Sequence, residues 1–177
     1  NPKKILVPAT ASFAAGQSSV VVPITAVENT LVDGDVLASF TAANSAYLTS
    51  TNSITVADDD VPILTVLAST TLVLENAGPN AAIGFVSRNT PTNSPLTVTL
   101  TSSDSSRLAV PASVIIPAGS ASAAFSIAAI DNTVADGSAQ INITASFSGF
   151  ISRPARLTVQ DDDTPALTVS LNQGSIA

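Results

Sequence analysis

The residues of this chain that could do chemistry are its carboxylates. Six of the thirteen acidic residues form two Asp triplets, at 58–60 and 161–163, and the others lie between short apolar stretches. Adjacent carboxylates repel one another, so a triplet is favourable only when it is solvated or shares a cation. Because the chain has no His and no Cys, a bound metal would be a hard, oxygen-bound cation such as Ca²⁺ rather than Zn²⁺. The spacing fits equally well a solvated turn without any metal.

The composition argues against catalysis and against nucleic-acid binding. Without His or Cys there is no Ser–His or Cys–His pair, and the two lysines, Lys3 and Lys4, stand together at the start of the chain. Tyr47 is the single Tyr and Trp is absent, so stacking platforms for a sugar are scarce. Six basic residues against a net charge of −7 leave no patch for phosphates. We therefore expect a non-enzymatic protein that binds no nucleic acid.

The chain repeats itself after 103 residues. Residues 1–74 align with residues 104–177 without a gap, with 24 of 74 positions identical. The identical positions include Asp33-Gly34 with Asp136-Gly137, and both Asp triplets with the Pro that follows each of them. A period near 100 residues is typical of whole β domains in tandem.

The elements that must position the acids are short strands. Apolar residues alternate with polar ones in stretches bounded by Gly, Pro, Asn and Asp, at 63–67, 71–74, 82–86, 96–101, 113–116, 123–130, 139–147 and 156–159. Alternation with a period of two and closely spaced turn signals predict an all-β, antiparallel β-sandwich. Five Phe residues fall in or beside such stretches and are predicted to be in the core: Phe13, Phe40, Phe85, Phe125 and Phe147.

The repeat predicts three segments. Residues 1–60 form the C-terminal half of a first module, 61–163 a complete module, and 164–177 the first strand of a third. Pro62 and Pro165 stiffen the two very short connections. The half-module has two explanations: the chain is part of a longer array, or one copy completes the next head-to-tail by strand addition. No apolar run is long enough to span a membrane.

Several motifs together resemble a Calx-beta repeat, the module of sodium–calcium exchangers and of many bacterial surface proteins. They are Leu74-Glu75-Asn76-Ala-Gly78, then Val110-Pro111 through Pro117-Ala-Gly119, then Ala129-Ile-Asp131-Asn132 with Asp136-Gly137, and Leu157-Thr-Val-Gln before the second Asp triplet. The resemblance implies tandem immunoglobulin-like sandwiches with Ca²⁺ at the tip next to the following module.

The resemblance also implies a set of calcium ligands. In the complete module these are Glu75, Asp104, Asp131, Asp136, Asp161, Asp162 and Asp163. In the half-module the corresponding residues are Glu28, Asp33, Asp58, Asp59 and Asp60, without an early Glu. Asn132 and Ala139 stand where the family has acids, and a Gly-Asp-Tyr segment is missing. Fewer carboxylates imply weaker binding of Ca²⁺.

These observations favour a structural repeat of a bacterial extracellular or cell-surface protein, such as an adhesin, matrix or filament protein. Ca²⁺ would stiffen the joints between modules, and the partners would be neighbouring modules or other copies of the chain. One alternative is an adhesive module that binds a glycan or a protein, for which the loop at 87–95 is the best candidate. Another is a passive spacer in a large secreted enzyme.

Overall fold

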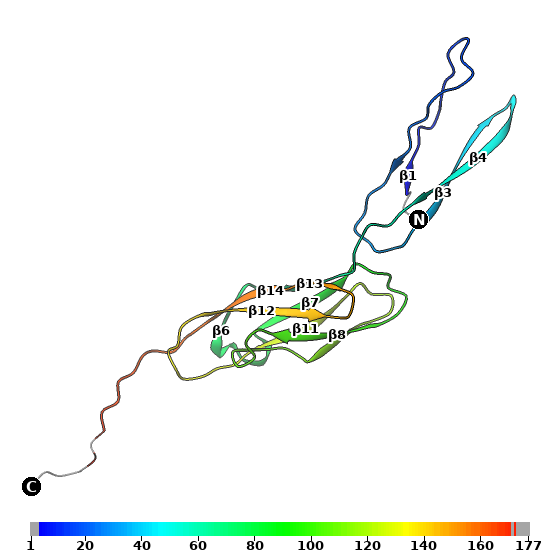
Figure 1. Ribbon diagram of the computed structural model, residues 1–177. Coiled ribbons are helices and arrows are strands. Elements are labelled where there is room, and N and C mark those ends of the chain that lie inside the picture. Colours follow the sequence, from blue (N-terminus) through cyan, green and yellow to red (C-terminus); the bar gives the residue numbers. More distant parts are fainter. Residues whose placement is uncertain (1–3, 171, 173–177) are drawn as a thin grey trace, which may run out of the picture. The chain divides into compact units, whose positions relative to one another are not determined.

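The computed structural model describes residues 4–170 and 172, and the chain divides into two compact units (Figure 1). The first unit contains the residues up to Pro62 together with Asn89–Pro91, and the second contains Ile63–Arg88 and the residues from Thr92 onward. The described residues include no helix that is long and apolar enough to cross a membrane.

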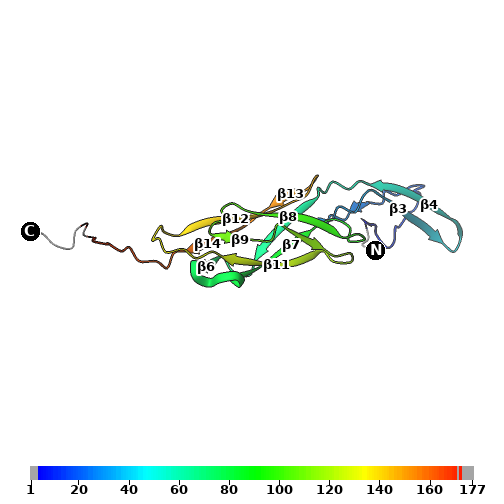
Figure 2. The ribbon, with the colours of Figure 1, turned by 90° about the horizontal axis from the view of Figure 1, so that it is seen from below.

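The second unit is a sandwich of two five-stranded sheets (Figure 2). One sheet has, in spatial order, β10 (Ser113–Ile116), β8 (Leu96–Ser102), β12 (Ala139–Ser146), β14 (Ala155–Gln160) and β6 (Leu72–Leu74). The other has β13 (Ile151–Arg153), β5 (Ile63–Ala68), β7 (Ala82–Arg88), β11 (Ser122–Ala129) and β9 (Leu108–Ala109). The predicted all-β sandwich is confirmed.

Most neighbouring strands in the sandwich are antiparallel, as the sequence predicted. Two pairs are parallel in addition: β13 lies beside β5, and β14 lies beside β6. Both parallel pairs have the same origin. β13 and β14 follow one another in the same direction on either side of Pro154, but they belong to different sheets. The fixed φ and missing N–H of proline suit such a switch between sheets.

The core of the sandwich follows from the alternation of side chains along its strands. Leu64 and Val66 of β5 are buried against Ile141 and Ile143 of β12 and Leu157 of β14, all at most 1% exposed. Successive side chains of a strand point to opposite faces, so the apolar residues at every second position meet between the two sheets.

The prediction that five Phe residues lie in the core was wrong for three of them. Phe125 is buried, and Phe40 is partly buried in its own unit. Phe85 lies on the outer face of β7, because the alternation there buries its neighbours instead. Phe147 follows the end of β12 and makes an edge-to-face contact with Phe150. Phe13 lies in a segment of the first unit without a covering strand and is 59% exposed.

The first unit contains two separate strand pairs. β1 (Ile5–Leu6) pairs with β2 (Thr25–Ala26), and β3 (Val36–Asn44) pairs with β4 (Tyr47–Val56). Both pairs keep the register of the repeat, since β1–β2 matches β9–β11 and the start of β3–β4 matches β12–β14. No described residue from 4 to 62 is buried, however.

Candidate metal centre

The topology brings three acidic segments to one end of the sandwich. The parallel strands β6 and β14 finish side by side, so Glu75 and the Asp triplet that follows Gln160 lie together. β12 starts at this end because it is antiparallel to β14, and the loop 130–138 leads into it. The local sequence thus places acids from three connections at a common tip.

Three carboxylates form the centre of this cluster. One oxygen each of Glu75, Asp136 and Asp161 lies within 4.8 Å of the others. Glu75 opens a 3-10 helix (Glu75–Asn80) and is 0% exposed. The Asn132 amide donates a hydrogen bond to Glu75 Oε1, while Glu75 Oε2 is buried without a hydrogen-bond partner. A buried carboxylate oxygen without a partner is costly, which makes Glu75 the residue that a ligand would satisfy.

The environment of Glu75 favours its neutral form. Burial is the main cause that raises the pKa of Glu75, and the nearby charges of Asp136 and Asp161 act in the same direction. The Asn132 hydrogen bond and the charge of Arg107 oppose this shift. A cation between these carboxylates would reverse the balance and stabilise the charged form.

Asp161 is held in place by backbone donors. Its Oδ1 accepts a hydrogen bond from the N–H of Asp163 at 2.8 Å, and its Oδ2 accepts one from the N–H of Gly137 at 2.5 Å. These two bonds, with that of Asp163 first, lower the pKa of Asp161. Gly137 has a φ of +84°, a conformation that residues with a Cβ rarely adopt. The Asp-Gly turn of the repeat therefore fixes an ionised carboxylate at the tip.

Asp163 has the same kind of unused oxygen as Glu75. Its Oδ2 is buried without a hydrogen-bond partner. Burial raises the pKa of Asp163, and the charges of Asp161 and Asp162 raise it further. Two unpartnered carboxylate oxygens thus belong to the same acidic end of the sandwich.

The sequence analysis missed a basic side chain that lies among these acids. Arg107, just before β9, pairs with Asp136, donates to the Gly137 carbonyl at 2.8 Å, and lies 3.9 Å from Asp104. The repeat contained the signal, because the equivalent Lys4 pairs with Asp33 at 2.6 Å in the first unit. In both units a basic residue restrains the acid of the Asp-Gly turn.

The other acids named from the sequence lie outside the central three. Asp104 accepts hydrogen bonds from the backbone and the hydroxyl of Ser106, and the hydroxyl bond is the main cause that lowers its pKa. Asp162 accepts a hydrogen bond from the Asn76 amide. Asp131 is exposed, and its charge contributes to the raised pKa of Asp163.

The first unit reproduces part of this arrangement. Asp58 accepts hydrogen bonds from the N–H of Gly34 at 2.5 Å and from the N–H of Asp60 at 3.1 Å, as Asp161 does in the sandwich. The Gly34 bond is the main cause that lowers the pKa of Asp58, and burial raises that of Asp60. Glu28 and Asp59 are exposed. Among the described residues of this unit no three acids come together as Glu75, Asp136 and Asp161 do.

The residues at the tip of the sandwich suit a hard divalent cation. Glu75, Asp136, Asp161 and Asp163 supply four carboxylates, and Arg107 neutralises one charge. Two of their oxygens are buried and have no hydrogen-bond partner. Carboxylate oxygens are the preferred ligands of Ca²⁺, which takes about six to eight of them together with carbonyls and waters.

The chain was compared with known proteins. No family model matches it, and no curated protein matches it. Among solved structures it is similar to the apo-form Calx CBD1 domain, with 19% identity and a TM-score of 0.43 over 57% of this chain and 99% of that chain. Calx-beta is also the family that the sequence motifs resemble.

Two further solved structures are similar to the chain. The E. coli chaperone DraB has 12% identity and a TM-score of 0.40, over 59% of this chain and 59% of that chain. A glycosyl hydrolase family 2 member from Bacteroides cellulosilyticus has 10% identity and a TM-score of 0.40, over 81% of this chain and 19% of that chain. The chain therefore spans about a fifth of the hydrolase.

Proposed function

We propose that this chain is a non-catalytic structural segment of a bacterial extracellular protein, in which Ca²⁺ at the acidic tip of the sandwich stiffens the connection to the residues that follow. The observation that carries the proposal is Glu75: a fully buried carboxylate, with one unpartnered oxygen, beside Asp136 and Asp161. Among the described residues no donor reaches that oxygen, and a bound cation would satisfy it.

The stiffening follows from where the ligands lie in the chain. Asp161 and Asp163 come directly after β14, and residues 164–170 leave the sandwich from there without secondary structure. Ca²⁺ held by Glu75, Asp136 and the Asp triplet would tie this exit to the 3-10 helix and to the loop 130–138. The ion would offset the mutual repulsion among these carboxylates. The segment that leaves the sandwich after β14 would therefore move less.

An extracellular setting agrees with the strength expected of such a site. Arg107 already compensates part of the charge, and Asn132 supplies an amide where a carboxylate would bind more tightly. Fewer ligand charges give weaker sites, of the type that extracellular modules use at millimolar Ca²⁺. The absence of Cys is compatible with this, since the sandwich has a core without disulfides.

Calorimetric unfolding in Ca²⁺, in Mg²⁺ and in a chelator tests the proposal. Binding to the folded state raises stability by about 2.7 kcal/mol when the free ion is at 100 times its dissociation constant. We expect a higher midpoint in Ca²⁺ than in Mg²⁺, and small-angle scattering should show a less flexible chain. An unchanged midpoint in Ca²⁺ would reduce the tip to a solvated turn and leave a passive spacer.

The repeat offers a matched control for this experiment. The triple substitution Asp161→Asn, Asp162→Asn, Asp163→Asn should abolish the effect of Ca²⁺ while the sandwich stays folded. The same change at Asp58, Asp59 and Asp60 should leave it intact, because no cluster of three acids lies there among the described residues. Equal losses in both variants would mean that Ca²⁺ acts through general charge screening.

A further inference from the structure

One basic side chain lies against the acids at the tip of the sandwich. The Arg107 guanidinium pairs with Asp136, one of the three central acids, and donates a hydrogen bond to the Gly137 carbonyl at 2.8 Å. Its Nε lies 3.9 Å from a carboxylate oxygen of Asp104. The Arg107 side chain is 16% exposed. A positive charge is therefore held between two acidic segments with little access to water.

The backbone of Arg107 belongs to the sandwich. Its carbonyl accepts a hydrogen bond from the N–H of Ile130 at 2.9 Å, and the N–H of Leu108 donates to the Asp104 carbonyl at 3.1 Å. The next two residues form β9, which pairs with the end of β11. An ion pair between exposed, mobile side chains contributes little because both have to be ordered. Here the backbone that carries the guanidinium is already fixed.

The charge of Arg107 acts on carboxylates that it does not contact. Burial is the main cause of the raised pKa of Glu75, and the charge of Arg107 opposes it. The backbone hydrogen bond from Asp163 is the main cause of the lowered pKa of Asp161, and the charge of Arg107 acts in the same direction. A bound metal ion would also favour the charged form of both carboxylates. Arg107 therefore supplies part of what a cation would supply at this tip.

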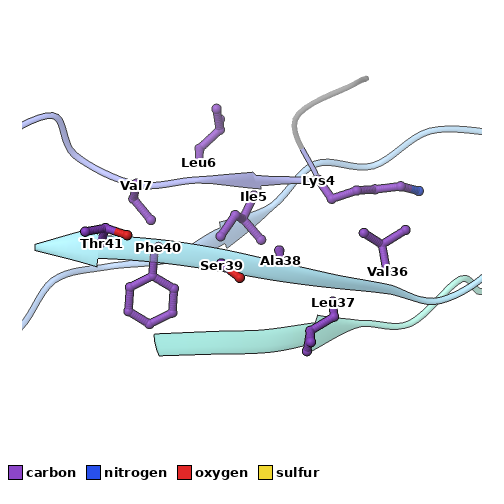
Figure 3. A pocket seen from close by; sticks show the side chains of 10 residues that line it. All are labelled: Lys4, Ile5, Leu6, Val7, Val36, Leu37, Ala38, Ser39, Phe40 and Thr41. Carbon is purple, nitrogen blue, oxygen red and sulfur yellow. The ribbon is translucent and has the colours of Figure 1, made fainter. Parts of the chain in front are cut away.

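The repeat has a second basic residue in the same place. Lys4 corresponds to Arg107 and pairs with Asp33, the equivalent of Asp136, at 2.6 Å. Figure 3, a view of a pocket of the first unit, shows the Lys4 side chain extending toward the end of β3 at which Val36 lies. The turn that contains Asp33 leads into this end of the strand. Arg and Lys differ in shape and in hydrogen bonding, so the property that recurs in both units is the positive charge.

We propose that Arg107 is a built-in counter-cation of the acidic tip, which holds the tip together without metal and competes with Ca²⁺ for Asp136. The first half of this statement depends on the contacts of Arg107, and the second half rests on the proposed function. A Ca²⁺ ion between Glu75, Asp136 and Asp161 would share Asp136 with the guanidinium, and the two positive charges would repel each other. Arg107 therefore raises the Ca²⁺ concentration at which the joint stiffens.

Calorimetric titration with Ca²⁺, combined with thermal unfolding in chelator, tests both halves. Arg107→Gln removes the charge and keeps a polar side chain. We expect this variant to bind Ca²⁺ at least about tenfold more tightly than the wild type. In chelator it should have a lower unfolding midpoint, because the carboxylates of the tip then repel one another without compensation. A residue that only orders the loop would lower the affinity for Ca²⁺ when it is replaced.

Two further variants serve as matched controls. Arg107→Lys should resemble the wild type in affinity and in midpoint, because Lys4 makes the equivalent pair in the repeat. Arg153→Gln removes the same charge from an exposed position of β13. β13 pairs with the start of β5, whereas the tip lies beyond the end of β14. We expect Arg153→Gln to change neither the affinity for Ca²⁺ nor the midpoint in chelator.

The outcomes separate this inference from the proposed function. Equal or weaker binding of Ca²⁺ by Arg107→Gln would overturn the inference and leave the proposed function intact. An unchanged midpoint of Arg107→Gln in chelator would also overturn it. Binding of millimolar Ca²⁺ by Arg107→Gln alone would support the inference and overturn the proposed function, because Arg107 would then exclude the ion from the wild type. If neither protein bound Ca²⁺, both would be overturned.

Discussion

The two units of this chain use related sequences, but among the described residues only one unit has a core. β9–β11 and β12–β14 of the sandwich recur as β1–β2 and β3–β4, in the same register. Yet Ile143 is 0% exposed, while no described residue from 4 to 62 is buried. Backbone pairing within the C-terminal half of the module depends on that half alone. Burial in the sandwich depends also on β5, β7 and β8, which have no counterpart among the described residues of the first unit.

The path of the chain also differs between the two units. In the sandwich, β12 leaves β14 after the pair Ile143 and Ala155 and turns to β8, and β13 joins the other sheet. In the first unit the equivalent strands stay paired up to Asn44 and Tyr47. Thr51 stands there in place of Pro154, and Thr retains the backbone N–H that proline lacks.

The largest effect expected from this comparison concerns the core. Ile143→Ala should lower the free energy of unfolding of the sandwich by about 2–5 kcal/mol, because it leaves a cavity among fully buried residues. Phe40→Ala, at the equivalent position of the first unit, should leave that transition unchanged. Denaturation followed by far-UV circular dichroism measures both. A comparable loss for Phe40→Ala would show that the first unit unfolds together with the sandwich.

The effect of Glu75→Gln on the free energy of unfolding should change sign when Ca²⁺ is added. In chelator the variant should be at least as stable as the wild type, because a neutral amide can donate to Asp136 or Asp161 where a buried charge repels them. In Ca²⁺ it should be less stable, since the gain of about 2.7 kcal/mol at 100 times the dissociation constant is lost. Glu28→Gln, at an exposed Glu of the first unit in the counterpart of the loop 130–138, is the control. Equal effects of Glu75→Gln in both solutions would contradict a metal site.

The same substitution predicts a dependence on pH. Burial raises the pKa of Glu75, so in chelator the folded state binds this proton more tightly than the unfolded chain. The cost of the charged carboxylate is full above the raised pKa and disappears as the pH falls through it. The excess stability of Glu75→Gln over the wild type should therefore shrink as the pH falls through the raised pKa toward the ordinary range of a Glu carboxyl.

The difference in stability between the two proteins at each pH reports on Glu75 alone. Asp104 and Asp161 have lowered pKa values and contribute stability that is lost as the pH falls, but they are present in both proteins. Urea midpoints of the two proteins at each pH give the difference directly. A gap that stays constant across the range would mean that Glu75 is ionised equally easily in the folded and unfolded states.

The smallest effect expected is at the Asp-Gly turns. Gly137→Ala should destabilise the sandwich by about 1–2 kcal/mol, because φ is +84° and a Cβ disfavours this conformation even in open space. Gly34→Ala makes the same change at φ +80°, in the unit without a core, and should leave the calorimetric midpoint of the sandwich unchanged. A stabilising Gly137→Ala would show that the turn adopts another conformation in solution.

Much of the sandwich could be predicted from the sequence, because its strands alternate clearly and turn residues bound them. The eight predicted stretches at 63–159 all contain strands of the structure, whereas β9 and β13 were missed. These two have only two and three residues, too few for alternation to be recognised. The parallel pairs depend on the switch at Pro154, which local patterns do not specify.

The acids of the candidate site could be predicted from the sequence, but the side chains that hold these acids in place could not. Glu75, Asp136 and Asp161 were all named from the resemblance, and their convergence follows from strand direction. Arg107 was overlooked, although the repeat aligns it with a second basic residue, Lys4. Asn132 was noted only as a missing acid, although its amide contacts Glu75 directly. Neither contact is visible until the loop 130–138 is folded over the 3-10 helix.

The two parallel pairs have a mechanical consequence. Tension on the chain pulls β5 toward Ile63 and the run β13–β14 toward Gln160, in opposite directions along strands that lie side by side. Three residue pairs join β13 to β5, and three join β14 to β6. Such a load shears each ladder, so its hydrogen bonds have to break together rather than one after another. The sandwich therefore resists stretching in the direction in which a string of modules would be pulled.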